Sequence, residues 1–165
     1  MKNSKTARLV LASLLTAACF VATTFISFRS PIQGSINAGD AIVLLSAFLL
    51  GPFYGAAAAG IGSALSDLAL GAAIFAPATL VIKALMALCA ALIFRALEKK
   101  QVLTGAITGA LAAEAIMIGG YFLYETAIFG FRTALVELPL NGIQATFGIA
   151  VGVPLYLAVR RFIKI

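Results

Sequence analysis

The chain has 165 residues, of which 62% are hydrophobic and 11% are charged. Soluble domains carry about 25% charged residues, so the composition predicts an integral membrane protein. At about 20 residues per span, the length suits a single membrane domain of six helices. The net charge of +6 does not indicate a nucleic-acid partner, because the basic residues gather at predicted helix ends, where the positive-inside rule explains them.

Several chemistries are excluded by what the sequence lacks. No Gly-rich phosphate loop followed by Lys-Ser or Lys-Thr is present, so the chain itself is not expected to bind ATP. The sequence contains no His, and its two cysteines are Cys19 and Cys89. This leaves no usual zinc site and no Cys–His nucleophile pair. We therefore predict neither an enzyme, nor a metal site, nor a catalytic cofactor.

The first apolar run follows Lys2, Lys5 and Arg8. A basic segment followed by an apolar one is also what a cleaved signal peptide shows. Here the apolar run continues through Phe28, which is too long for a signal peptide. We interpret it as the first transmembrane helix, covering about residues 7–28.

Proline and glycine divide the rest of the chain. Proline does not continue a helix and restricts the residue before it, so Gly51-Pro52 ends one helix, and Pro77 suits the first turn of another. Polar stretches at 31–39, 98–101 and 125–138 are predicted to be loops. The prediction is an all-α membrane domain over residues 1–165, with helices at about 7–28, 40–50, 56–70, 77–97, 103–124 and 139–162.

The basic residues orient these six helices. Six spans place both termini on one side of the membrane, and the other side receives only Arg29 and Arg132. The positive-inside rule makes the basic side cytoplasmic. The residues on that side are Lys2, Lys5, Arg8, Arg95, Lys99, Lys100, Arg160, Arg161 and Lys164.

Once the helices are oriented, polar side chains from five segments fall in the outer half of the membrane. A charge at mid-membrane costs roughly 2.5–3.5 kcal/mol, so an ionisable residue there is a candidate functional residue. We predict a substrate pocket that opens to the exterior. Its candidate residues are Asn37, Asp40, Asp67, Lys83, Glu114, Tyr121, Tyr124, Asn141 and Gln144.

Each candidate also has a purely structural interpretation. The alternatives are an N-cap for Asp40, mutual neutralisation of Asp67 and Lys83, pairing of Glu114 with Lys83 or its protonation by burial, interhelical hydrogen bonds for Asn141 and Gln144, and an interfacial aromatic belt for Tyr121 and Tyr124.

Small residues recur at four-residue spacing, as in the pairs Ala12–Thr16 and Ser13–Ala17 of the first helix. Such faces let helices approach closely. Most are expected to serve internal packing, but a face on the first helix could receive another subunit.

Several short segments carry a family resemblance: Asn37-Ala-Gly-Asp40, Leu-Gly-Pro-Phe-Tyr-Gly at 50–55, Ser-Asp-Leu at 66–68, and Ala-Pro-Ala-Thr at 76–79 leading to Lys83. With six short helices and a basic rim, the chain resembles the substrate-binding S components of energy-coupling factor (ECF) vitamin transporters. It is most similar to the branch for riboflavin, hydroxymethylpyrimidine and vitamin B6.

The resemblance implies a multi-pass protein of a prokaryotic cell membrane. Such a protein captures a vitamin at the outer face and docks on a membrane scaffold subunit that is coupled to two cytoplasmic ATPases, which alone use ATP. Docking in the family uses an Ala-xxx-Ala pattern on the first helix, which falls here on Ala12 to Thr16 or Ser13 to Ala17. The ligand residues carried over are those of the loop after the first helix with Lys83, Glu114, Tyr121, Asn141 and Gln144, whereas Asp67 lies outside the ligand helices.

The nature of the vitamin is a separate question. Tyr, Asn, Gln and a carboxylate suit a small aromatic heterocycle that bears hydroxyls. Because the chain has no Trp, we favour vitamin B6 or hydroxymethylpyrimidine, with riboflavin as the alternative. A second alternative is a carrier that acts alone, in which Asp67, Lys83 and Glu114 form a proton relay.

Overall fold

The computed structural model describes residues 5–30 and 35–162. Lys2, Lys164 and positions 31–34 of the predicted first loop lie outside the described residues. The prediction of six helices is confirmed, and two short strands accompany them. The elements are α1 (Lys5–Phe25), β1 (Ser27–Arg29), β2 (Ser35–Asn37), α2 (Gly39–Leu50), α3 (Pro52–Ala69), α4 (Ala76–Leu97), α5 (Val102–Phe129) and α6 (Phe131–Val159).

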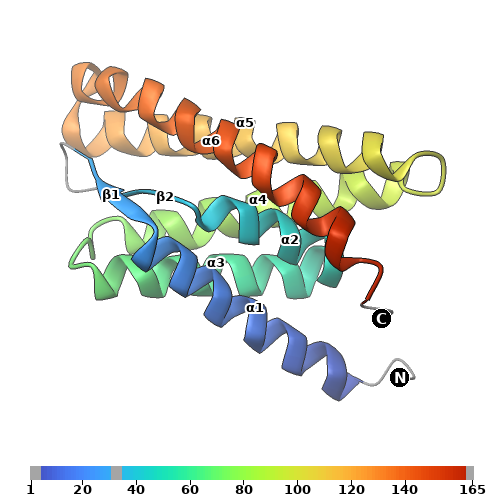
Figure 1. Cartoon of the computed structure of the whole chain (residues 1–165). Helices are drawn as coiled ribbons and strands as arrows, with labels where there is room; N and C mark the ends of the chain where they lie inside the picture. Colours follow the sequence, from blue (N-terminus) through green and yellow to red (C-terminus); the bar gives the residue numbers. More distant parts are fainter. Residues whose placement is uncertain (1–4, 31–34, 163–165) are drawn as a thin grey trace.

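The helices run roughly side by side, and the strands lie at one end of the bundle (Figure 1). α1 packs on α3, α3 on α4, α4 on α5, and α5 on α6. The start of α1, the α4–α5 turn and the end of α6 lie at the end opposite the strands. That end carries Arg8, Arg95, Lys99, Lys100 and Arg160, so it is the cytoplasmic end.

Helix α2 occupies the centre of the bundle, where it contacts α1, α3, α4 and α6. None of its 12 residues is exposed. At 1.5 Å per residue it is about 18 Å long, shorter than the roughly 30 Å hydrocarbon core of a bilayer. Its neighbours surround it, so its apolar side chains are buried against protein and form the core on which the other helices pack.

Four helices are long and apolar enough to cross a membrane, namely α1, α4, α5 and α6. Their exposed residues are largely apolar, for example Leu14, Leu85, Leu111 and Ile143. An apolar exterior of this kind is expected where the solvent is lipid rather than water. The bundle is therefore a multi-pass membrane domain.

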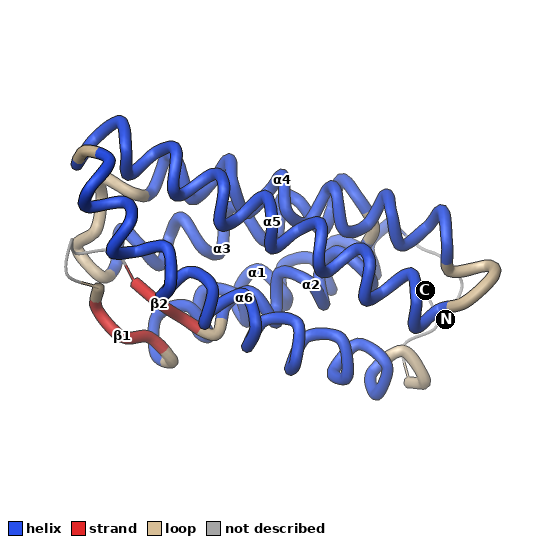
Figure 2. Tube along the Cα trace, turned by 90° about the horizontal axis from the view of Figure 1, so that it is seen from above, coloured by secondary structure: helices blue, strands red, loops and turns tan. Residues whose placement is uncertain are grey.

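The two strands form an antiparallel hairpin at the outer end (Figure 2). Phe28 pairs with Ile36, and Ser27 pairs with Asn37. The backbone N–H of Ala38 then donates to the carbonyl of Ile26 at 3.0 Å. These bonds fasten the start of α2 beside the end of α1.

Four predicted helix boundaries are wrong. Helix 1 ends at Phe25, because the residues that follow it enter the hairpin. The third helix begins at Pro52 and not near residue 56, so Gly51 alone, with a φ of 80°, separates α2 from α3. The predicted loop at 125–138 is helical except at Gly130, so α5 and α6 are longer than expected and Pro139 lies inside α6.

Glycines set how closely the helices approach. A Cβ on Gly62 of α3 would lie 2.5 Å from the carbonyl oxygen of Thr16 on α1. A Cβ on Gly109 of α5 would lie 2.8 Å from the carbonyl oxygen of Ala90 on α4. Real Cβ atoms do not tolerate such contacts, so these two glycines let α1 pack closely on α3 and α5 pack closely on α4.

Gly62→Ala should therefore destabilise the bundle. Overpacking a tight contact typically costs about 1–3 kcal/mol, which outweighs the helix-propensity gain of about 1 kcal/mol. We expect a fall of several degrees in the melting temperature of the purified protein. Gly119→Ala is the matched control, since a Cβ there meets nothing within 4 Å, and it should leave the melting temperature unchanged or raised. Equal effects of the two substitutions would contradict this packing.

Candidate substrate-binding site

A buried ion pair lies in the outer half of the bundle. The Lys83 ammonium on α4 donates a hydrogen bond to Asp40 Oδ1 on α2. Asp40 is fully buried and Lys83 is 2% exposed. The structural alternatives left two other partners open for Lys83, Asp67 and Glu114, and neither forms this ion pair. The capping alternative for Asp40 also fails, because α2 has no side-chain cap.

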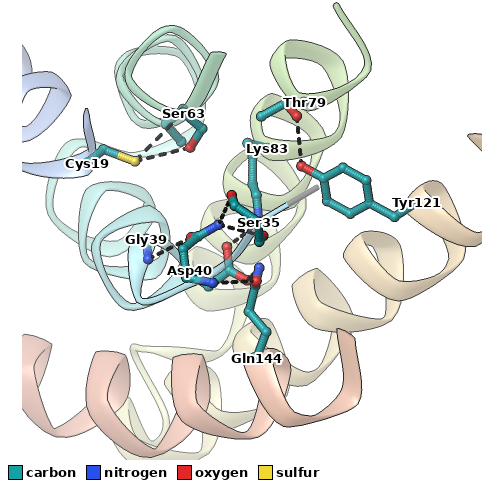
Figure 3. A network of polar contacts seen from close by, with 11 residues as sticks. Cys19, Ser35, Gly39, Asp40, Ser63, Thr79, Lys83, Tyr121 and Gln144 are labelled. Atoms are coloured by element: carbon teal, nitrogen blue, oxygen red, sulfur yellow. Dashed lines mark hydrogen bonds and ion pairs between the residues drawn. The ribbon is translucent and has the colours of Figure 1, made fainter. Parts of the chain in front are cut away.

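Gln144 of α6 extends this pair into a network (Figure 3). Its Nε2 donates to Asp40 Oδ2 at 2.7 Å, and its Oε1 accepts the backbone N–H of Asn37 at 2.9 Å. Asn37 Oδ1 in turn accepts the N–H of Gly39 at 2.9 Å. One amide therefore links α6, the ion pair and strand β2, which holds the outer ends of three elements together.

Tyr121 of α5 closes the network on the side of α4. Its hydroxyl donates to Thr79 Oγ1 at 3.0 Å. The Lys83 ammonium lies 5.5 Å from the centre of the Tyr121 ring, a geometry for cation–π attraction. The ring is thereby fixed by its neighbours, with its hydroxyl turned toward α4 (Figure 3).

Glu114 lies behind the ion pair, close to α6. A Cβ on Gly148 would meet Glu114 Oε1 at 2.5 Å and Asp40 Cβ at 2.9 Å. Glu114 is 2% exposed, and neither of its oxygens has a hydrogen-bond partner among the described residues. Gly148 thus leaves room for both carboxylate side chains where α6 crosses α2 and α5.

A cavity opens beside this network, between β2 and the outer parts of α3 to α6. Its volume is about 30 Å³, enough for a water molecule or two but not for an organic ligand. Most of the residues that line it are polar, and a larger guest would have to push the walls apart. The described residues that line it are Thr23, Ser30, Ser35, Ile36, Asn37, Asp67, Phe75, Thr79, Lys83, Tyr121, Glu125, Glu137, Asn141 and Gln144.

The predicted site residues fall into three groups. Asn37, Asp67, Lys83, Tyr121, Asn141 and Gln144 line the cavity. Asp40 and Glu114 lie behind it. Tyr124 is not among the lining residues; its hydroxyl donates to the carbonyl of Ile74 and its ring packs on Phe75, so the structure does not bring it to the site.

Sequence reasoning missed several of the lining residues. Glu137 was assigned to a loop, because Glu125 to Leu138 looked too polar for a helix. Thr23 and Ser30 carried no motif, and Phe75 preceded a predicted helix start. Helical spacing from Asn141 could have found Glu137, since residues four apart share a face.

The residues proposed for docking lie away from the cavity, on α1. Ser13 and Ala17 are exposed, whereas Ala12 and Thr16 are half-buried. The Thr16 carbonyl lies against Gly62 of α3. Of the two spacings predicted for docking, Ser13–Ala17 is therefore the one that is not turned into the bundle.

The fold and the cavity together define a class of protein: a multi-pass membrane protein with a polar cavity near its outer face. The chain matches the family model described as the ECF-type riboflavin transporter, S component, over residues 3–161. It belongs to this family, which is a family of transport proteins and not of enzymes. The resemblance inferred from the sequence is confirmed.

Two similar proteins add detail. The chain is 32% identical over 136 residues to an uncharacterised protein in the gap 3′ region of Pyrococcus woesei, covering 80% of this chain and 88% of the relative. It also matches a solved S component of a bacterial ECF transporter, with a TM-score of 0.77 and 25% identity over 98% of this chain and 100% of that one. Of the comparisons, the family description is the one that names a vitamin, and it favours the riboflavin alternative over the smaller vitamins.

A double-substitution experiment tests whether Asp40 and Lys83 act as a pair. Asp40→Asn or Lys83→Met alone leaves one buried charge without its partner, which typically costs about 3–5 kcal/mol. Combining both substitutions removes both charges, so the double variant should melt at a higher temperature than either single one. Thermal unfolding of the purified proteins measures this, with Lys99→Met as the control on an exposed cytoplasmic lysine. Strictly additive losses would refute the pairing.

Proposed function

We propose that this protein captures riboflavin at the outer face of the membrane, as the S component of an ATP-driven ECF importer. The observation that carries the proposal is the cavity beside the Asp40–Lys83 pair, where polar groups from β2, α3, α4, α5 and α6 converge. A concave site with a few convergent polar groups is the usual form of a small-molecule site. The family description, which names riboflavin, supports this choice of vitamin.

The chemistry of the walls suits this ligand. Riboflavin has a flat ring system with carbonyl oxygens and ring nitrogens, and a side chain of hydroxyls. Tyr121 and Phe75 offer aromatic surface for the ring. Asn141 and Gln144 carry amides that both donate and accept hydrogen bonds. Lys83 adds a donor for a ring carbonyl while it remains neutralised by Asp40.

One observation favours a smaller ligand as the second candidate. The cavity volume of about 30 Å³ requires wall movement for any vitamin, and less movement for a single ring than for three fused rings. Pyridoxine or hydroxymethylpyrimidine therefore remains the second candidate. The absence of Trp from the chain supports the same choice.

The partners follow from what the chain lacks and from one exposed face. A chain without a nucleotide-binding motif needs other subunits to use ATP, and we propose that these are the scaffold subunit and two ATPases of the ECF module. The small residues Ser13 and Ala17 are exposed on α1, where a scaffold helix could approach closely. We propose this spacing as the docking register.

Direct binding measurements test the proposed ligand. Purified protein should quench the fluorescence of riboflavin, and Asn141→Ala should weaken binding at least about tenfold, because a buried amide contact is lost. Gln101→Ala, on the exposed cytoplasmic turn, should bind like the wild type. Calorimetry with pyridoxine and hydroxymethylpyrimidine examines the second candidate.

Three results would count against the proposal. If none of the three vitamins binds and Asn141→Ala does not change vitamin uptake by cells, the binding function is wrong. If pyridoxine binds and riboflavin does not, the second candidate replaces the first. Transport into liposomes by this chain alone, driven by a proton gradient, would support the independent carrier over the subunit.

A further inference from the structure

The acidic residues of this chain are distributed very unevenly. The chain has six, and all but Glu98 lie in the outer half, at the cavity or behind it. Asp40 is neutralised by Lys83, and Glu114 lies behind that pair. Asp67, Glu125 and Glu137 line the cavity itself. We call these three residues the carboxylate subsite.

The carboxylate subsite is assembled from three helices. Asp67 lies in the last turn of α3, beside Thr79 of α4. Glu125 of α5 lies next to Asn141 and close to Glu137, both on α6. The three side chains are 5%, 4% and 3% exposed, respectively. Burying carboxylates from separate helices around one cavity is costly unless something compensates them.

Unpartnered polar atoms in the same walls point to a ligand. Asp67 Oδ2 and Glu125 Oε2 meet no hydrogen-bond donor among the described residues. The hydroxyl oxygens of Thr23 and Ser30, also in the walls, are equally without partners there. Buried polar groups are normally hydrogen-bonded. This part of the cavity therefore presents acceptors and hydroxyls that a guest could satisfy.

The cations of this region are engaged or lie elsewhere. Lys83 is the one cation among the described lining residues, and it is paired with Asp40. Arg29 donates to the carbonyl of Leu70 at 3.0 Å, outside the lining set. Arg132 is exposed in the first turn of α6. An anionic group inside the cavity would therefore face carboxylates and no uncommitted cation among the described residues.

We infer that the carboxylate subsite receives the hydroxyl-bearing end of the ligand and rejects its phosphate ester. This inference rests on the proposed function and adds a specificity to it. The unpartnered carboxyl oxygens of Asp67 and Glu125 accept hydrogen bonds, so they suit the donor hydroxyls of a vitamin. A phosphate monoester carries about two negative charges at neutral pH and brings mainly acceptors, so it is repelled at short range in this poorly solvated site.

The test compares riboflavin with riboflavin 5′-phosphate on the full-length purified protein. We expect the phosphate ester to bind at least about tenfold more weakly than riboflavin. Glu125→Gln should reduce the ratio of the two dissociation constants, riboflavin 5′-phosphate over riboflavin, at least threefold. Asp67→Asn, on the other side of the subsite, should reduce the same ratio. Glu98→Gln, at the cytoplasmic end, is the matched control and should keep the wild-type ratio.

The outcomes separate the two proposals. Equal binding of riboflavin and its phosphate by the wild type, or an unchanged ratio in both subsite variants, overturns the carboxylate subsite and leaves the proposed function intact. If riboflavin does not bind but pyridoxine does, the same comparison is made with pyridoxine and its 5′-phosphate. A phosphate ester that binds as well as pyridoxine then overturns the inference. If none of these vitamins binds, the proposed function falls and the inference falls with it.

Discussion

The ion pair between Asp40 and Lys83 determines how the outer half of this protein is built. It joins α2 to α4 where both side chains are almost fully buried. A buried charge without a partner costs several kcal/mol, so the two helices must keep the height and rotation that bring these groups together. Gln144 then binds the remaining Asp40 oxygen and the backbone of Asn37, which places α6 and β2 relative to the pair.

The close approach of the helices makes this arrangement possible. Gly152 of α6 lies against Ala41 of α2, and Gly148 leaves space for the carboxylates of Asp40 and Glu114. Larger residues at these positions would push α6 away from α2 and disrupt the hydrogen-bond network around the ion pair. The cavity is therefore bounded by the ion pair on its inner side and by the hairpin on its outer side, with Lys83 and Tyr121 in its wall.

The sequence was sufficient for the number of helices, their orientation and the gathering of polar residues at the outer end. Charge at helix ends and period-3.6 spacing are local signals, and Asn141, Gln144 and Gly148 do share a buried face. The partner of Lys83 could not be predicted, because the choice among Asp40, Asp67 and Glu114 depends on how deeply α2 sits in the bundle. Tyr124 was misplaced because a helix end gives no information about which of two neighbouring tyrosines turns inward.

A crystal structure of the purified protein with riboflavin bound tests the central claim most directly. The account predicts the vitamin between β2 and the outer ends of α4, α5 and α6, with Asn141 and Tyr121 in contact with it and the Asp40–Lys83 pair intact behind it. A ligand bound at the cytoplasmic end, near Arg8 and Arg95, or a bound state in which Lys83 leaves Asp40, would contradict it.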